Sequence, residues 1–345
     1  MRPLPLMTML EGLACDVRHP HQRLIVMPND GAEAVLGLIA LAQRELLLKQ
    51  FKLESPEVLQ ALDDAHARGV RVRVMLNPHT SGGTRWNDNA FERLQAAGVD
   101  VAWTSDRFPV THEKSMVIDR KEVLISTFNL SNKYFTQTRD YGIVTFATEV
   151  VEQVIACFEA DWERREFEPD LTTGLFWSNQ YSRGQIARLI DEAEDTLDIQ
   201  HPKFVDAVIL DRVIKARERG VKVRVLCGGK HGISDWDIYD TFSSLRIMRH
   251  AGVKIRRQKH LKLHAKLILV DGRYAQTGSM NLDRSAFDVR RELGVGSDAE
   301  DVLMRLKRIF EADWDQAHAY EAPDPLDPAA HDDGELIPDP EFVHE

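Results

Sequence analysis

Hydrophobic residues along the chain switch between helical and strand-like spacing, in the same order at two places. Apolar positions recur at helical spacing from Ala32 to Leu48 and from Gly184 to Ile199. A short apolar run typical of a buried strand precedes each of these segments, at Leu24–Met27 and Leu175–Trp177. The pattern therefore predicts a strand followed by an amphipathic helix in both places.

A second helix is predicted to end at Gly69 and again at Gly220, because glycine readily takes the left-handed conformation that closes a helix. Apolar residues occupy every second position directly after each glycine, at Val70, Val72 and Val74 and at Val221, Val223 and Val225. Such alternation is typical of a strand. Strands that alternate with helices predict an α/β layered fold.

The residues themselves also repeat. The sequence Phe-Glu-Ala-Asp-Trp occurs at 158–162 and at 310–314, 152 positions later. Arg-Gly-Val-x-Val-Arg-Val begins at Arg68 and at Arg219, and Ala-Gly-Val begins at Ala97 and at Ala251. Landmarks in one order at a nearly constant offset indicate a duplicated unit, which at about 150 residues can hold a core of its own.

This repeat divides the chain into four parts. We expect a first half at 22–170 and a second half at 171–320, after an N-terminal segment at 1–21. The tail at 321–345 is rich in Pro, Asp and Glu and lacks periodicity, so we expect it to be disordered.

The composition fits a globular protein, since 345 residues with 43% hydrophobic content can bury one large core or two ordinary ones. The longest uninterrupted apolar stretch, Ala34–Ala42, is far shorter than the roughly 20 residues that span a membrane. Met1–Gly12 lacks the pattern of a secretory signal, so we expect a cytoplasmic protein. The cysteines lack metal-ligand spacing and predict reduced thiols, at Cys15, Cys157 and Cys227.

The polar residues that could carry chemistry occur at matching positions in the two halves. The first half contains His112, Lys114, Asp119, Thr127, Asn129 and Asp140. The second half contains His264, Lys266, Asp271, Ser279, Asn281 and Glu292. Every counterpart lies 152 positions later, as in 264 − 112 = 152, so no insertion separates the members. Histidine and lysine two apart in a strand-like run project from the same face, and a return strand at Tyr274–Thr277 would bring Ser279 and Asn281 alongside.

These residue types suit the chemistry of a phosphodiester. Two histidines, His112 and His264, can supply a nucleophile and a general acid. Positive charge from Lys114 and Lys266 can neutralise phosphate oxygens. The side chains of Thr127, Asn129, Ser279 and Asn281 can donate oriented hydrogen bonds to the same oxygens. Carboxylates at Asp140 and Glu292 are candidates to orient the imidazoles.

His-x-Lys, four residues, Asp, six residues and then Gly-Ser-x-Asn resembles the signature of the phospholipase D superfamily, and both copies fit its spacing. The segment Gly278–Asp283 with Glu292 is similar to the bacterial cardiolipin synthase branch. Ser126 stands where the family pattern has glycine, and Asp140 stands where the second copy has glutamate. The resemblance implies duplicated α-β-α layers, with mixed sheets flanked by helices and the halves related by a pseudo-twofold axis. It also implies one shared site, a phosphohistidine intermediate, and neither metal nor cofactor.

Three functions remain open from the sequence. The first is a phosphodiesterase or phosphatidyltransferase acting on glycerophospholipids, the second a nuclease or other phosphodiesterase, and the third a catalytically dead binding protein. The formal net charge of −11 disfavours nucleic acid, although the basic run at 256–262 leads into His264. We favour the lipid substrate. We expect peripheral attachment to the inner face of the membrane and no obligate protein partner.

Other residues invite structural interpretations. We expect Asp119 and Asp271 to stabilise turns, and His201 to be a structural histidine. Trp86 and Trp236 lie in loops after the Val-rich strands, where α/β folds place ligand contacts, so they are candidates for substrate selection.

Overall fold

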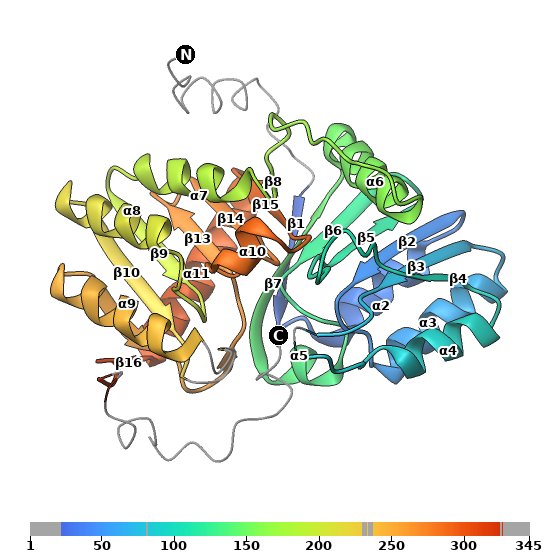
Figure 1. The fold of residues 1–345 in the computed structure, drawn as a ribbon, viewed down its shortest axis with the longest axis horizontal. Helices are drawn as coiled ribbons and strands as arrows, with labels where there is room; N and C mark the ends of the chain where they lie inside the picture. The colour runs from blue at the N-terminus through green and yellow to red at the C-terminus, as the bar shows by residue number, and fades with distance from the viewer. Residues whose placement is uncertain (1–21, 81, 230–232, 234–236, 325, 327–345) are drawn as a thin grey trace.

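The computed structural model describes residues 22–80, 82–229, 233, 237–324 and 326. The predicted N-terminal segment 1–21 lies outside them, as does the tail 321–345 apart from 321–324 and 326. Within the described residues the chain forms two eight-stranded mixed sheets flanked by helices, one from each half apart from a two-residue strand of the second half that joins the first sheet (Figure 1). The predicted duplicated α/β fold is thereby confirmed.

The first half runs through β1 (Gln22–Met27), α2 (Gly31–Leu41), β2 (Glu45–Gln50), α3 (Pro56–Ala67), β3 (Arg71–Leu76), α4 (Asp88–Ala96), β4 (Asp100–Trp103), β5 (Ser115–Ile118), β6 (Glu122–Ser126), α5 (Asn132–Thr136), β7 (Thr138–Thr145) and α6 (Thr148–Trp162). Its sheet has the order β1-β7-β6-β5-β2-β3-β4. Strands β2, β3 and β4 are parallel, whereas β5 pairs antiparallel with β2.

The second half repeats this order with β8 (Leu175–Trp177), α7 (Ser182–Asp191), β9 (Thr196–Gln200), α8 (Ala207–Glu218), β10 (Lys222–Cys227), α9 (Ile238–His250), β11 (Lys254–Arg257), β12 (Lys262–Leu263), β13 (Leu267–Val270), β14 (Tyr274–Gly278), α10 (Arg284–Asp288), β15 (Leu293–Ser297), α11 (Glu300–Gln316) and β16 (His318–Ala319). Its sheet has the order β16-β11-β10-β9-β13-β14-β15-β8. The short strand β12 instead pairs with β7 and so belongs to the first sheet.

Three large hydrophobic clusters hold the layers together. One lies between the first sheet and helices α2, α3, α4 and α5, and another lies between the second sheet and helices α7, α8, α9 and α10. The third joins the opposite faces of both sheets through α6 and α11, with Phe158 and Leu306 fully buried in it. The two halves therefore share a continuous core.

Two predicted helices were too long. Ala32–Leu48 contains helix α2 and then strand β2, and Gly184–Ile199 contains α7 and then β9. Strand β2 packs apolar residues on both faces, with Leu46 and Leu48 in one cluster and Leu47 in another, so its apolar run resembles a buried helix by periodicity alone. Strand β9 does alternate, with Leu197 and Ile199 in the core on either side of Asp198, but two apolar positions are too few to separate it from the helical spacing before it. The predicted hairpin is correct, since β13 and β14 pair antiparallel.

Asp119 and Asp271 have structural roles, as expected, but not by bonding their own turns. Each adopts φ near +51° and accepts hydrogen bonds from backbone N–H groups where a distant strand begins. Asp119 thereby holds the start of β2, and Asp271 holds the start of β9.

Among the helices of the described residues, none combines the length and the apolar character that a membrane-spanning segment requires.

Candidate active site

The backbone of each histidine is hydrogen-bonded to the other half of the molecule. The backbone N–H groups of His112 and Glu113 donate to the carbonyl oxygen of Arg291, at 2.9 and 3.0 Å. The N–H of His264 donates to the carbonyl oxygen of Arg139 at 3.2 Å, next to the pairing of β12 with β7. The backbone thus places each histidine beside the other half's β7 or β15 region.

The carboxylates also pair across the halves. The Nδ1 atom of His112 lies 3.0 Å from Oε2 of Glu292, and Nδ1 of His264 lies 2.6 Å from Oδ1 of Asp140. A carboxylate at Nδ1 favours the tautomer that leaves Nε2 with a lone pair. Each imidazole therefore has at Nδ1 a carboxyl group that the other half supplies.

Both rings are buried and lie against aromatic side chains. The ring of Phe51 meets His112 edge to face with centroids 4.7 Å apart, and Tyr134 meets His264 similarly at 4.8 Å. Burial, followed by the charge of Lys114, holds the pKa of His112 well below its ordinary value. Burial also lowers the pKa of His264 to about 3, although Asp140 opposes the shift.

The two orienting carboxylates have different electrostatics. Burial raises the pKa of Glu292 to about 8, against the opposing charges of Lys114 and Arg290. Burial alone would also raise the pKa of Asp140, but His264 and Lys266 hold it below its ordinary value. The hydroxyls of Thr127 and Thr138 donate to Asp140 at 2.5 and 2.6 Å. The halves are therefore chemically unequal.

The two lysines lie beside their histidines. The Nζ atoms of Lys114 and Lys266 donate to the carbonyl oxygens of His112 and His264, at 2.8 and 2.9 Å. Burial, followed by the charge of Lys114, lowers the pKa of Lys266 well below its ordinary value. The Nζ atom of Lys266 also lies 2.9 Å from Nε2 of His264. The Nε2 atom of His112, by contrast, is buried without a hydrogen-bond partner in the described part of the chain.

The four predicted phosphate-binding side chains are all buried near this centre, but they differ in their contacts. The hydroxyl of Thr127 donates to Asp140, and the hydroxyl of Ser279 exchanges hydrogen bonds with the backbone of Leu293. These contacts favour a role in supporting the carboxylates over direct phosphate binding. The Oδ1 atom of Asn281 has no partner among the described residues, while Asn129 is equally buried.

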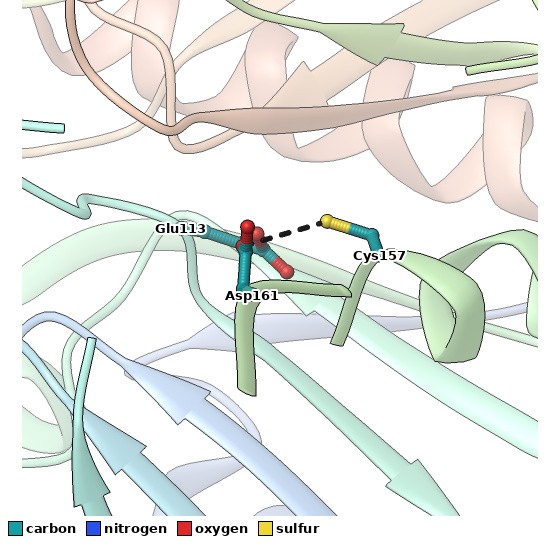
Figure 2. Close-up of side chains that lie close together, drawn as sticks. All are labelled: Glu113, Cys157 and Asp161. Carbon is teal, nitrogen blue, oxygen red and sulfur yellow. Dashed lines mark hydrogen bonds between the residues drawn. The ribbon is translucent and has the colours of Figure 1, made fainter. Parts of the chain in front are cut away.

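Three potential metal ligands cluster behind His112. Atoms of Glu113, Cys157 and Asp161 lie within 4.8 Å of one another (Figure 2). The ammonium of Lys49 already lies among them, 3.0 Å from Glu113, 3.4 Å from Cys157 Sγ and 2.7 Å from Asp161. Burial would lower the pKa of Lys49, but Asp161 and Glu113 raise it above its ordinary value. A lysine cation thus occupies the position where a metal ion would bind.

Sequence reasoning missed several residues of this network. Lys49 has Gln200 at the matching position and Glu113 has Ala265, so the repeat gave no signal for either. The pairs Arg139 with Asp313 and Arg291 with Asp161 are different, because all four residues recur at the constant offset and could have been found.

The predicted substrate-selecting tryptophans have separate outcomes. Trp86 packs against Phe51, the residue that contacts His112, and its ring lies 4.0 Å from Nζ of Lys52. Trp236 lies outside the described residues. In the basic run, Arg256 donates to the carbonyl of Trp314, and Arg257 lies over the ring of Tyr320. These contacts give the two arginines packing roles.

Comparison with known proteins identifies relatives that cover both halves. The family described as "Cardiolipin synthase, PLD-like domain" matches residues 35–162 and 186–314. The cardiolipin synthase of Oceanobacillus iheyensis is 26% identical over 325 residues, which cover 83% of this chain and 67% of that protein. Cardiolipin synthase 1 of Staphylococcus epidermidis is 22% identical over 333 residues, with 83% and 66% covered. The chain thus spans about two thirds of the length of these relatives.

Solved structures show the same fold. The phosphatidylserine synthase of Haemophilus influenzae superimposes with a TM-score of 0.67 at 14% identity, covering 88% of each chain. The polyphosphate kinase of Porphyromonas gingivalis superimposes with a TM-score of 0.68 at 16% identity, covering 96% of this chain and 56% of the kinase. At such low identity these similarities extend to the fold alone.

Proposed function

This chain belongs to the cardiolipin synthase, PLD-like domain family, and we propose that it is a phosphodiesterase or phosphatidyltransferase that acts on glycerophospholipids. The observation that carries the proposal is the exchange of carboxylates, which joins His112 to Glu292 and His264 to Asp140 across the two halves. This exchange makes one active site from two motifs.

His112 is the proposed nucleophile. Its low pKa keeps the imidazole neutral. The carbonyl oxygen of Ser279, 3.1 Å from Nδ1, can only accept, so together with Glu292 it keeps the proton on Nδ1 and leaves the lone pair on Nε2, the atom without a partner in the described chain. Attack by Nε2 on phosphorus forms an N–P bond as the bond to the leaving alcohol breaks. Lys114 and Lys266 neutralise the phosphate oxygens in the transition state, and the negative charge of the bound phosphodiester favours the ammonium form of Lys266 against the effect of burial.

His264 is the proposed general acid. The leaving alkoxide takes the proton from Nε2 of His264, and Asp140 stabilises the imidazolium before that transfer. A bound phosphodiester anion raises the pKa of His264 from its low value, because an opposite charge favours the protonated form. Water or an acceptor alcohol then gives its proton to His264 and attacks the phosphohistidine, which releases His112.

The names of the relatives support a lipid substrate. Proteins called cardiolipin synthase match both halves, and a phosphatidylserine synthase shares the fold. The net charge of −11 also opposes the electrostatic attraction to nucleic acid. We propose that the enzyme attaches peripherally to a membrane on its cytoplasmic side.

A substrate panel tests this proposal. Purified protein is incubated with phosphatidylglycerol vesicles, with other phospholipids, and with single- and double-stranded DNA, each with and without glycerol as acceptor. We expect phospholipid turnover, with release of the head group or transfer to glycerol, and none in the His264→Ala control. Cleavage of DNA without phospholipid turnover would replace the lipid proposal with a nuclease. Absence of turnover on every substrate would favour a catalytically dead binding protein.

A further inference from the structure

Two buried ion pairs connect the halves at matching positions. The guanidinium of Arg291 binds Asp161 through two hydrogen bonds, Nη2 to Oδ1 at 2.8 Å and Nε to Oδ2 at 3.1 Å. The guanidinium of Arg139 binds Asp313 in the same way, at 2.9 and 2.7 Å. The side chains of all four are at most 7% exposed. Two-point pairing of this kind fixes orientation as well as distance.

Each arginine of these pairs lies next to a carboxylate of the candidate active site. Arg291 directly precedes Glu292, which orients His112, and Arg139 directly precedes Asp140, which orients His264. The carbonyl oxygen of Arg291 also accepts from the N–H of His112. One residue therefore carries a backbone contact to the histidine, a side-chain contact to α6, and the neighbouring carboxylate.

The aspartates belong to the repeated Phe-Glu-Ala-Asp-Trp sequence. Asp161 lies in the last turn of α6, in the half that holds His112, while its partner Arg291 comes from the second half. Asp313 in α11 shares the second half with His264, while Arg139 comes from the first. Each of these two Arg–Asp pairs, called a clamp below, thus joins the half that holds a histidine to the half that holds the carboxylate paired with that histidine.

We propose that Asp161 and Asp313 are positioning residues of the active site, which hold Glu292 and Asp140 against His112 and His264 by clamping Arg291 and Arg139 across the halves. The inference deepens the proposed function, on which its catalytic part rests. The repeated sequence at 158–162 and 310–314 then has a role beyond packing. Its aspartate fixes the arginine of the other half and thereby the carboxylate that follows that arginine.

The glutamates of the same repeat provide a matched contrast. Glu159 binds Arg73 at 2.7 Å and Glu311 binds Arg224 at 2.7 Å, and in both pairs the two residues come from the same half. Arg73 is buried like Arg291 and lies over the ring of Trp162. Loss of Arg73, a residue of β3, therefore removes a buried guanidinium that contacts α6 and leaves the link between the halves intact.

The first clamp offers the cleaner test because Asp161 keeps Lys49 at 2.7 Å when Arg291 is replaced. The variants are Arg291→Met, the conservative Arg291→Lys, and the control Arg73→Met. We expect Arg291→Met to lower kcat by about 10- to 100-fold, the cost of a displacement near 1 Å, with KM changed little because both lysines remain. Arg291→Lys should restore part of kcat, and Arg73→Met should leave kcat within about twofold of the wild type.

A second measurement does not depend on turnover. The proton between Nδ1 of His112 and Glu292 should give a downfield NMR resonance, identified by its loss in His112→Ala. We expect Arg291→Met to shift or broaden it and Arg73→Met to preserve it. If the wild type has no activity but Arg291→Met perturbs the resonance, the clamp stands and the proposed function fails. An unchanged resonance and unchanged kcat in folded Arg291→Met would overturn the clamp.

Discussion

Replacement of Lys49 by methionine tests the electrostatic network behind His112. Lys49 is fully buried and contacts the carboxylates of Glu113 and Asp161 at 3.0 and 2.7 Å. Methionine keeps the length of the side chain but leaves Glu113 without its cation, whereas Asp161 keeps Arg291. Breaking a buried pair in this way costs about 3–5 kcal/mol, because one charge stays buried and uncompensated.

The size of the effect should depend on burial and not on distance. Arg107 and Glu166 form an ion pair at the same 2.7 Å, but their side chains are 39% and 87% exposed. Arg107→Met should therefore cost only about 0–1 kcal/mol. In the double variant Lys49→Met/Glu113→Gln the stranded carboxylate is neutral, so we expect it to recover roughly 1–3 kcal/mol relative to Lys49→Met.

Urea denaturation followed by circular dichroism gives the free energy of unfolding of all four proteins. We expect the order wild type, Arg107→Met, double variant and Lys49→Met, from most to least stable. If Lys49→Met costs no more than Arg107→Met, or if the added Glu113→Gln gives no recovery, the reasoning about the buried carboxylate is wrong.

Three further predictions concern pH, charge and metal. Buried His201 and His264 have pKa values lowered to about 3, so the unfolded chain binds protons below about 6.5 that the folded chain does not, and stability should fall as pH drops from 6.5 toward 3. Each histidine changes the free energy of unfolding by about 1.4 kcal/mol per pH unit in this range. Denaturation at several pH values should therefore show a weaker dependence of the free energy of unfolding on pH for His201→Gln than for the wild type. An equal dependence would contradict a buried neutral histidine. Lys114→Met and Lys266→Met should each lower kcat by about 100-fold with the circular dichroism spectrum retained, and normal turnover in both would exclude neutralisation of the phosphate by these lysines. Activity should persist in excess chelator, because these ammonium groups supply the charge that a divalent ion would provide, and loss restored by adding such an ion would refute this.

The repeat in the sequence was sufficient to predict the duplicated fold and to identify candidate residues for one site. The constant offset between the two polar sets does not depend on secondary structure, so the wrong helix assignments at Ala32–Leu48 and Gly184–Ile199 did not affect it. The resemblance to the phospholipase D superfamily is confirmed by the family match over both halves. The first error arose because β2 is buried on both faces and its apolar run has no alternation to distinguish it from a helix. The second arose because β9 offers only Leu197 and Ile199 as alternating apolar positions, too few to separate from the helical spacing before them.

Pairing across the halves could not be predicted from the sequence. Asp140 and Glu292 were identified as orienting residues, but the chain alone does not show which carboxylate meets which histidine, since that depends on how two sheets pack. Lys49 was also missed, because a lysine in an apolar run reads as an interruption of the pattern. Its buried position becomes understandable only with Glu113 and Asp161 beside it.

The central claim is that both motifs form one site with His112 as the nucleophile. Rapid acid-free quenching of the enzyme with a phospholipid labelled in its phosphate, followed by peptide mapping, measures this directly. We expect one labelled phosphatidyl group per chain, carried by His112 in the wild type, and none in His112→Ala. Label on His264 would reverse the two roles, and label on both histidines of one chain would contradict a single shared site.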